Sequence, residues 1–351
     1  MLGSMKKDQA IEYYKALLER EPEYEGVFFA GIKTTGIFCR PTCPARKPKF
    51  ENCEFFKTTQ EALLAGYRPC KRCKPMSLPN SPSQAMQVLV DAVEAEPEKR
   101  WKDKHVREMG LDPSTVRRQF KKRFGMTFIG YARARRMGVA LKVIREGDKV
   151  INAQIDASYE SASGFRDAFT KIMGTPPNKA KDHIVLKADW IDTPLGAMLA
   201  VADDHALHLL EFTDRRGLER EIEHMRKTQN AAIIPGKNKI LDQIKSELST
   251  YFEGDLKTFR TPLNLYGSDF QISVLKVLMD IPYGETRSYA GHARILGNPK
   301  AVRAVARANG SNQIAIVIPC HRVIGSDGKL TGYAGGLARK QWLLDHERKN
   351  Q

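Results

Sequence analysis

Apolar positions recur with helical spacing through the middle of the chain, from residue 84 to about residue 180. Glycine interrupts this pattern at Gly110, Gly125, Gly147 and Gly174. The pair Pro176-Pro177 ends it, because proline cannot continue a helix. We therefore expect a region made only of helices.

Beyond residue 184 the pattern changes to short apolar runs, which are typical of strands. We expect three strands here, at Ile184–Leu186, Gly196–Val201 and Ala206–Phe212. Asp203-Asp204 predicts a turn between the last two. Helical spacing returns at 238–253 and 269–280, and again from Ser288 to the end. The sequence therefore predicts an α/β unit followed by a mainly helical unit.

A chain of 351 residues is too long for one core and should form several domains. We expect a small cysteine-rich domain at 5–76, a linker rich in proline and serine at 77–83, and the helical domain at 84–180. The α/β unit covers 184–265 and the last unit covers 266–351. The expected fold class is therefore multidomain, part α/β and part all-α.

Positive charge is in excess and is clustered. The net charge is +16, and sixteen Lys or Arg against five Asp or Glu lie between Lys99 and Lys149, so a net +11 of the +16 falls there. Clustering favours a polyanionic partner over a merely soluble basic surface. We expect that partner to be a nucleic acid, and the family resemblances described below imply double-stranded DNA.

Nothing in the chain predicts a membrane association. No apolar run approaches the ~18 residues of a membrane span, and Met1–Lys7 lacks the apolar centre of a signal peptide. The family resemblances described below imply a monomer in the bacterial cytoplasm, associated with the nucleoid.

Five of the six cysteines lie between Cys39 and Cys73. Two close pairs, Cys39-x3-Cys43 and Cys70-x2-Cys73, can each supply two corners of a tetrahedron, so we predict a Zn²⁺ site. Cys53 has no near partner and is interpreted as an incidental thiol. Whether the metal does more than hold the fold stays open, since closed four-ligand sites are usually structural.

Residues 109–125 predict a turn followed by an amphipathic helix. Gly110 ends the preceding helix, Asp112 caps the next and Pro113 occupies its first position. Its apolar face consists of Val116, Phe120 and Phe124. Its basic face consists of Arg117, Arg118, Lys121 and Lys122. This is the form of a helix-turn-helix recognition helix, although a solvated basic helix would look similar.

A second unit of this kind occurs at 159–177, where we expect Phe165, Phe169 and Ile172 to face inward. Because two such units follow one another in the chain, a solvated surface helix explains the pattern less well than a DNA-binding domain. Together they resemble the AraC/XylS family of transcription regulators, which implies a double helix-turn-helix domain over 84–180.

Cys320 stands alone, and a lone cysteine is usually a core thiol. Ile314–Ile318 predicts a buried strand, and Pro319-Cys320-His321-Arg322 follows where that strand would end. A thiol beside an imidazole and a guanidinium is placed to ionise. A Cys-His hydrolase is the alternative, but its third partner is not evident.

Residues 34–46 and 66–75 resemble the N-terminal domain of the Ada adaptive-response proteins. The resemblance implies that Cys39 accepts a methyl group from a DNA methylphosphotriester. Loss of one thiolate charge would then strengthen contacts of nearby Arg40, Arg46, Lys47 and Lys49 with phosphate. It also implies transcriptional activation, with RNA polymerase as a further partner.

Pro319–Arg322, with 281–289 and 298–305, resembles the O6-alkylguanine-DNA alkyltransferases over about 184–351. The resemblance implies an α/β subdomain and a helical subdomain with a winged-helix-like element. It implies that Cys320 accepts the alkyl group once, that His321 deprotonates it through a water, that Glu347 orients His321, and that Asn312 braces the turn.

The same resemblance implies that Arg303 fills the gap left by an extruded base and that Tyr289 rotates the phosphate. We expect Ala301, Ala304 and Ala308 to form a smooth face toward the DNA, flanked by Arg303 and Arg307, although a packing helix would show the same pattern. Ala334 stands where some relatives carry serine, so the range of alkyl groups stays open.

Two other classes of protein remain as alternatives. One is a transcription factor that senses damage without repair, and the other is a structural zinc protein. A protein that only binds DNA needs no nucleophile, so Cys320, His321 and Glu347 favour the reading that combines repair and regulation.

Overall fold

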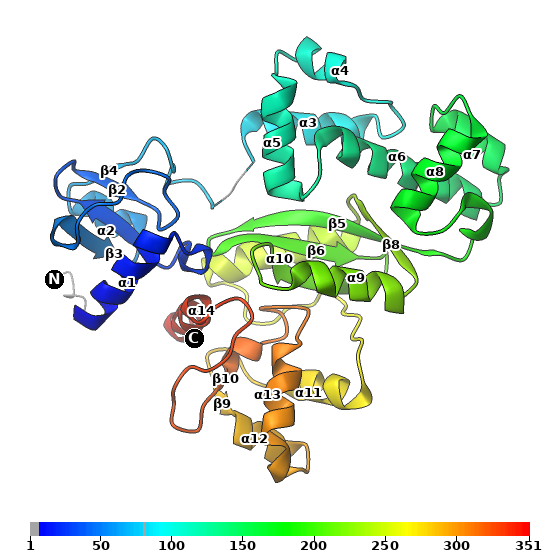
Figure 1. Ribbon diagram of the computed structural model, residues 1–351. Helices are drawn as coiled ribbons and strands as arrows, with labels where there is room; N and C mark the ends of the chain where they lie inside the picture. The colour runs from blue at the N-terminus through cyan, green and yellow to red at the C-terminus, as the bar shows by residue number, and fades with distance from the viewer. Residues whose placement is uncertain (1–6, 80–81) are drawn as a thin grey trace.

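The N-terminal domain is a small sheet with helices on its faces, seen at the left of the computed structural model in Figure 1. The structure describes residues 7–79 and 82–351, so the expected domain start at Met5 and the linker residues Asn80 and Ser81 lie outside it. The strands β1 (Phe29–Ile32), β2 (Ile37–Cys39), β3 (Cys53–Phe56) and β4 (Arg68–Pro69) lie in the order β3-β1-β2-β4. The helices are α1 (Lys7–Glu19), the 3-10 turns η1 (Pro22–Tyr24) and η2 (Phe50–Asn52), and α2 (Thr59–Leu64).

The central region contains only helices among its described residues, as the spacing predicts. They are α3 (Gln84–Ala95), α4 (Asp103–Glu108), α5 (Pro113–Phe124), α6 (Phe128–Arg145), α7 (Val150–Asp156), α8 (Ala162–Met173) and the 3-10 turn η3 (Pro177–Lys179). Gly125 and Gly174 end α5 and α8 with left-handed backbones, φ +70° and +77°, which glycine adopts without strain. The long helix α6 joins the two helical units.

A second sheet forms the centre of the molecule, between the helical domain above it and the last unit below it in Figure 1. Its order is β7-β6-β5-β8, with β5 (Ile184–Thr193) antiparallel to β6 (Gly196–Ala202) and parallel to β8 (Ala231–Pro235). The strand β7 (Leu207–Phe212) pairs with β6. The helices α9 (Leu218–Thr228) and α10 (Lys239–Glu253) complete this unit.

The last unit carries Cys320. Its elements are α11 (Asp269–Met279), β9 (Arg287–Ser288), α12 (Tyr289–Ile295), η4 (Pro299–Ala301), α13 (Val302–Gly310), η5 (Cys320–Arg322), β10 (Val323–Ile324) and α14 (Leu337–Lys349). The two short strands pair in parallel. Helical structure therefore does not run unbroken from Ser288, because an irregular segment separates α13 from α14.

The predicted buried strand at Ile314–Ile318 is wrong. Ile314 makes a single bridge to Leu210, after which the chain turns, and Ile316 adopts φ +72°. The Ile318 amide bonds back to the Ile314 carbonyl at 3.0 Å, so the segment cannot extend. The run is apolar because it is buried in a turn, and burial alone does not distinguish a turn from a strand.

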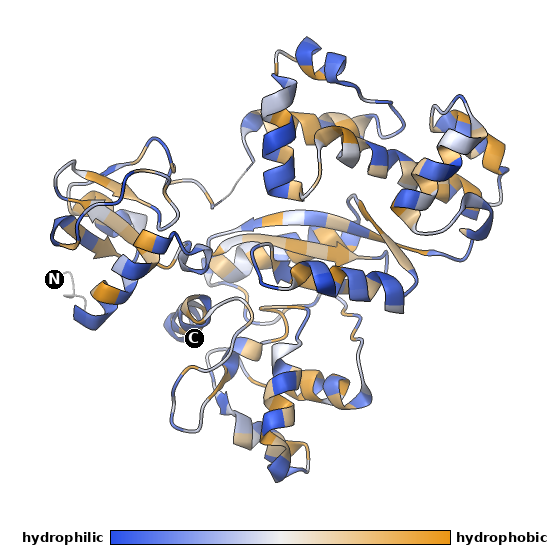
Figure 2. Cartoon of the chain, viewed as in Figure 1, coloured by the Kyte–Doolittle hydropathy of each residue, from blue (hydrophilic) through white to orange (hydrophobic). Residues whose placement is uncertain are grey.

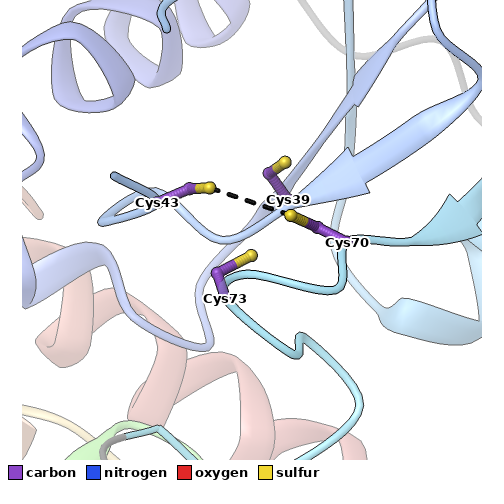
Figure 3. A group of neighbouring side chains, drawn as sticks. All are labelled: Cys39, Cys43, Cys70 and Cys73. Carbon is purple, nitrogen blue, oxygen red and sulfur yellow. Dashed lines mark hydrogen bonds between the residues drawn. The ribbon is translucent and has the colours of Figure 1, made fainter. Parts of the chain in front are cut away.

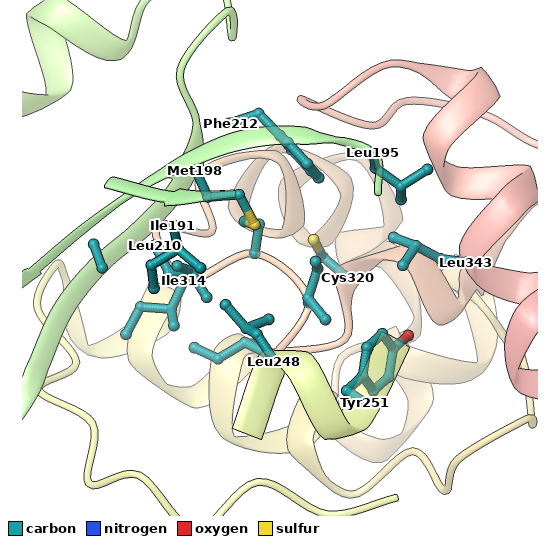
Figure 4. Packing of buried hydrophobic residues seen from close by; sticks show 14 of the residues in the cluster. Ile191, Leu195, Met198, Leu210, Phe212, Leu248, Tyr251, Ile314, Cys320 and Leu343 are labelled. Atoms are coloured by element: carbon teal, nitrogen blue, oxygen red, sulfur yellow. The ribbon is translucent and has the colours of Figure 1, made fainter. Parts of the chain in front are cut away.

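One hydrophobic core joins the first and last parts of the chain. Tyr13 and Phe28 from the N-terminal domain lie in the same buried cluster as Phe212, Leu343 and Cys320. Figure 4 shows Cys320 among the apolar side chains of this cluster. The N-terminal domain is thus packed against the unit that carries the lone thiol. Among the described residues, no helix has the length and apolar character to span a bilayer.

Candidate active site and metal centre

Cys320 begins the 3-10 turn η5 and is 6% exposed. The Asn312 side-chain amide lies 3.0 Å from its sulfur and 2.9 Å from the Ile318 carbonyl, to which it donates. The Asn312 oxygen accepts from the Ile314 amide at 3.0 Å. One buried amide side chain therefore holds both the turn and the thiol in place.

Glu347 is a fully buried residue of α14 and binds the two residues that follow the thiol. One of its oxygens accepts from His321 Nε2 at 2.8 Å, and Arg322 Nε donates to the other at 2.8 Å. The Tyr251 hydroxyl and the Gly284 amide donate to it as well, at 2.8 and 3.1 Å. Burial raises the pKa of Glu347, but His321 and Arg322 outweigh it, so the pKa lies well below its usual range. Glu347 is a carboxylate at neutral pH.

Glu347 also selects the tautomer of His321. Because a carboxylate accepts hydrogen bonds only, Nε2 carries the proton and Nδ1 carries the lone pair. Nδ1 is buried and has no hydrogen-bond partner among the described residues. Burial lowers the pKa of His321, so the imidazole is neutral and Nδ1 is available to accept a proton.

The expected ionisation of Cys320 does not hold for the resting protein. Burial raises the pKa of the thiol to about 11, although the Asn312 hydrogen bond acts in the opposite direction. The Arg322 guanidinium does not lie against the sulfur, because it binds Glu347 and the Ile281 carbonyl. The thiol is therefore protonated at neutral pH, and a base must remove its proton during any reaction.

Two residues of this site, Tyr251 and Lys340, and the hydrogen bond from Arg322 to Glu347 were not predicted from the sequence. Lys340 is fully buried, and its ammonium donates to the carbonyls of Val323 and Thr331 at 2.6 and 2.8 Å. A signal was present, since Lys340 and Glu347 lie at i and i+7 on the face of α14 that carries Leu343 and Leu344. A charged residue on an apolar face indicates a buried polar contact.

The helix α13 presents Arg303 and Arg307 to solvent, while Val305 packs inward. Ala304 is exposed, but Ala308 is buried and does not belong to an open face as expected. Tyr289 is the first residue of α12, and its hydroxyl lies 3.3 Å from the Thr331 carbonyl and 3.4 Å from the Asn309 amide. The helix α13 thus presents two exposed arginines in the unit that holds the buried thiol.

The helix α5 is capped as the sequence predicts, with the Asp112 side chain accepting from the Thr115 amide at 2.7 Å. Its apolar face is buried and its four basic side chains, Arg117, Arg118, Lys121 and Lys122, are exposed. Figure 2 shows this helix as largely hydrophilic. In α8, Phe165 and Phe169 are buried as expected, but Met173 completes the buried face and Ile172 is only partly buried.

Four cysteines meet where β2 ends and β4 is followed by a turn (Figure 3). The sulfur atoms of Cys39, Cys43, Cys70 and Cys73 all lie within 4.8 Å of one another, and those of Cys43 and Cys70 are 4.0 Å apart. Four converging soft ligands in a largely buried place fit tetrahedral Zn²⁺, which is the cofactor of this domain. Cys53 lies apart and donates to the Lys49 carbonyl at 3.3 Å.

The charges around these cysteines differ from the expectation. Arg40 is buried and bound to Glu25 at 3.0 Å, so it cannot meet a phosphate. Lys47 is half-buried, and its ammonium donates to the Pro41 and Cys43 carbonyls. Arg46 and Lys49 remain exposed. A basic residue near a site is available to a ligand only when no buried carboxylate or carbonyl group holds it.

Replacement of Glu347 by Gln should remove part of the acid sensitivity of the fold. The unfolded carboxyl titrates near 4.5 and the folded one below it, so its stabilisation is present above pH 4.5 and is lost as pH falls through the lower value. Burial lowers the pKa of His321 from 6.5, so the unfolded chain takes up this proton more readily than the folded protein does. His321 therefore destabilises the fold further below pH 6.5. Glu347→Gln leaves Arg322 buried without a counter-charge and should cost about 3–5 kcal/mol at neutral pH.

The measurement is urea unfolding from pH 2 to pH 8, which covers the range below pH 4.5 where the Glu347 stabilisation is lost, followed through the protection of α14 amides. Asp345→Asn is the matched control, because Asp345 lies on the same helix but is half exposed. Equal stabilities of the two variants at pH 7 would contradict this account of Glu347.

Comparison with known proteins gives four successive matches to family models. They are "Metal binding domain of Ada" at 12–76, "Helix-turn-helix domain" at 106–183, "6-O-methylguanine DNA methyltransferase, ribonuclease-like domain" at 186–265, and the DNA binding domain of the same methyltransferases at 269–349. Among solved structures, the chain is similar to Mycobacterium tuberculosis OGT in complex with DNA, at 40% identity, over 48% of this chain and 94% of that one, with a TM-score of 0.41. It is also similar to the methylated N-ADA/DNA complex, at 35% identity, over 38% of this chain and 98% of that one, with a TM-score of 0.30.

More than one relative matches the chain almost from end to end, and the first of these is an activator and repair enzyme. It is the Escherichia coli "Bifunctional transcriptional activator/DNA repair enzyme Ada", 30% identical over 344 residues, which are 96% of this chain and 96% of that protein. A Methanosarcina barkeri methylated-DNA–protein-cysteine methyltransferase is 43% identical over 46% of this chain and 97% of its own length. The four matched segments follow the same order as in this family, and the match to the E. coli protein covers 96% of both chains. The chain therefore belongs to the Ada family and has its full-length architecture.

Proposed function

We propose that this protein repairs alkylated DNA by moving methyl groups onto two of its own cysteines. Cys320 takes the methyl group of O6-methylguanine, and of O4-methylthymine, and Cys39 takes that of a DNA methylphosphotriester. The observation that carries the proposal is the buried network of Asn312, Cys320, His321 and Glu347 beside the cationic helix α13. The similarity to the E. coli activator and repair enzyme supports it.

The chemistry at Cys320 is a displacement at carbon. The sulfur forms a bond to the methyl carbon, the bond between that carbon and O6 breaks, and the electron pair stays with the guanine. His321 Nδ1 takes the thiol proton through a water, and the imidazolium then returns a proton to the guanine anion, so atoms and charges balance. Glu347 steadies the imidazolium that forms. A thioether has no leaving path, so each Cys320 reacts once.

Access to the base requires that it leave the stack, since the thiol is buried. Arg303, exposed on α13, is placed to enter the duplex and occupy the gap, with Arg307 one turn further along the helix on phosphate. Tyr289 turns the phosphate of the extruded nucleotide. Its hydroxyl lies near the Thr331 carbonyl, at the start of the loop 331–336.

The N-terminal and helical domains supply recognition and regulation. Bound Zn²⁺ keeps its thiolates ionised and soft, which makes Cys39 a nucleophile. Arg46 approaches the phosphate of the methylphosphotriester. The exposed basic face of α5, formed by Arg117, Arg118, Lys121 and Lys122, contacts the promoter. The methylated protein then activates alkylation-response genes as a monomer, together with RNA polymerase.

A regulator that senses damage without efficient repair is the second candidate. The raised pKa of Cys320 favours it, because a protonated thiol is a weak nucleophile. The neutral His321 with a free Nδ1 favours repair, since a binding protein has no use for a base there. We therefore place repair first.

Replacement of Cys320 by Ala should abolish methyl transfer from O6-methylguanine and leave transfer to Cys39, because the two cysteines are separate nucleophiles in separate domains. Mass spectrometry of peptides after incubation with methylated DNA measures both. Cys53→Ser is the control and should keep both activities. Methylation of more than one equivalent per Cys320 under repeated challenge would refute the single reaction.

Zinc content tests the ligand set. Cys43→Ser should lower bound zinc, because it removes one of four soft ligands, whereas Cys53→Ser should leave one zinc per chain. Elemental analysis of the purified variants measures the metal. The ligand assignment is wrong if zinc falls with Cys53 and survives the loss of Cys43.

Methylation of Cys39 should raise the affinity for promoter DNA. Four thiolates and one Zn²⁺ carry two net negative charges, and methylation removes one of them. At about 5 Å and an effective dielectric of about 20, this weakens repulsion of a phosphate by ~3 kcal/mol. A titration over a salt series compares methylated with unmethylated protein, and the gain should shrink as salt rises. Equal affinities at low salt would leave Cys39 without a signalling role.

A further inference from the structure

Two helices with exposed basic side chains lie on opposite sides of the central sheet, α5 above it and α13 below it in Figure 1. We propose that one molecule binds two separate segments of double-stranded DNA at the same time, one along each helix. The proposal rests on the proposed function, which assigns a DNA contact to both helices. It adds that the fold keeps the two contacts apart, so a molecule held at one DNA segment keeps the Cys320 unit available to another.

The C-terminal end of α5 is fixed on strand β5. The Arg123 guanidinium lies 2.6 Å from the Asp192 carboxylate, and both side chains are largely buried. The Phe124 ring meets the Trp190 ring edge to face, with the ring centroids 4.8 Å apart. Separation of the ion pair would leave a charge with little access to water, and separation of the rings would expose apolar surface. Both contacts therefore hold this end of the helix on the sheet.

The rest of the helical domain is docked on strand β8 and helix α9. A Cβ atom at Gly138 of α6 would overlap the Ile234 side chain of β8, so this helix lies directly against the strand. Ile234 also shares a buried cluster with Phe169 of α8. The Arg226 guanidinium on α9 donates to the Ile172 carbonyl at 3.2 Å. The helical domain is thus held at several places, so it cannot swing freely about its connection to β5.

The helix α13 is attached to the same sheet at strand β7. Shortly after this helix ends, the Leu210 amide donates to the Gln313 carbonyl at 2.9 Å, and the Ala315 amide donates to the Leu210 carbonyl at 2.8 Å. Strand β7 forms one edge of the sheet, and β6 separates it from β5. Each of the two helices therefore meets the sheet at its C-terminal end and extends away from it, α5 to one side and α13 to the other (Figure 1).

The basic side chains of both helices stay open to solvent in this docked arrangement. They are Arg117, Arg118, Lys121 and Lys122 on α5, and Arg303 and Arg307 on α13. Neither set is covered by the other half of the chain, so neither helix needs the other for its own contact with DNA. The net charge of +16 offsets the repulsion between two duplexes held on one molecule. Both sets of side chains can therefore be occupied at once.

The stiffness of DNA favours two segments over one. A duplex bends little over lengths shorter than about 150 base pairs. To contact both helices, one duplex would have to turn back around the molecule within a few helical turns, because the sheet lies between α5 and α13. Two separate segments meet the same side chains without this bend. The geometry therefore points to two DNA segments on each molecule.

Native mass spectrometry of the full chain with duplexes of about 16 base pairs, or one and a half helical turns, counts the DNA bound to each molecule. We expect one protein molecule with two duplexes at low salt. The double variant Arg303→Ala with Arg307→Ala should lose one duplex, and Lys121→Ala with Lys122→Ala should lose the other. The matched control is Lys227→Ala with Arg348→Ala, which removes two exposed basic side chains from other helices and should keep both duplexes.

Longer duplexes, of about 40 base pairs, test whether one segment can reach both helices. We expect two of them on each molecule as well. A complex with only one duplex in the unchanged protein would overturn the proposal, as would two short duplexes retained in both helix variants. Peptide mass spectrometry after incubation with methylated DNA tests the proposed function separately. Methyl transfer by a protein that binds only one duplex would count against this inference alone, and two bound duplexes without transfer would count against the repair function alone.

Discussion

A single buried carboxylate organises the C-terminal half of the protein. Glu347 is on the last helix, and the groups that donate to it come from α10, from the segment after α11 and from η5. An unpaired carboxylate at this depth would be very unfavourable, so the four elements can pack only in the arrangement that satisfies it. The position of Cys320 follows from this, because η5 holds the thiol and His321 in consecutive residues.

Features that depend on local chemistry could be predicted from the sequence. The cap at Asp112, the turn at Gly125 and the buried spacing of Val116, Phe120 and Phe124 each depend on residues within one helix. The convergence of two cysteine pairs was predictable for a similar reason, since spacing alone restricts where their sulfur atoms can lie.

Features that depend on distant partners could not be predicted in this way. Ile314–Ile318 has the composition of a strand, but the Asn312 side chain and the edge of β7 bend it into a turn. Arg322 adjoins Cys320 in sequence, yet it is held by Glu347, which lies twenty-five residues away. Arg40 beside Cys39 is held in the same manner by Glu25. In each case a buried carboxylate or carbonyl competes for the side chain, and the sequence does not show where that group lies.

The depth of Cys320 has a consequence for the lifetime of the protein. With a pKa of about 11, only about one thiol in ten thousand is ionised at pH 7. Peroxides and other oxidants attack the thiolate, so the resting sulfur is nearly inert toward them. Under the proposed function this protection matters, because a cysteine that reacts only once must keep its thiol intact until a damaged base is delivered to it.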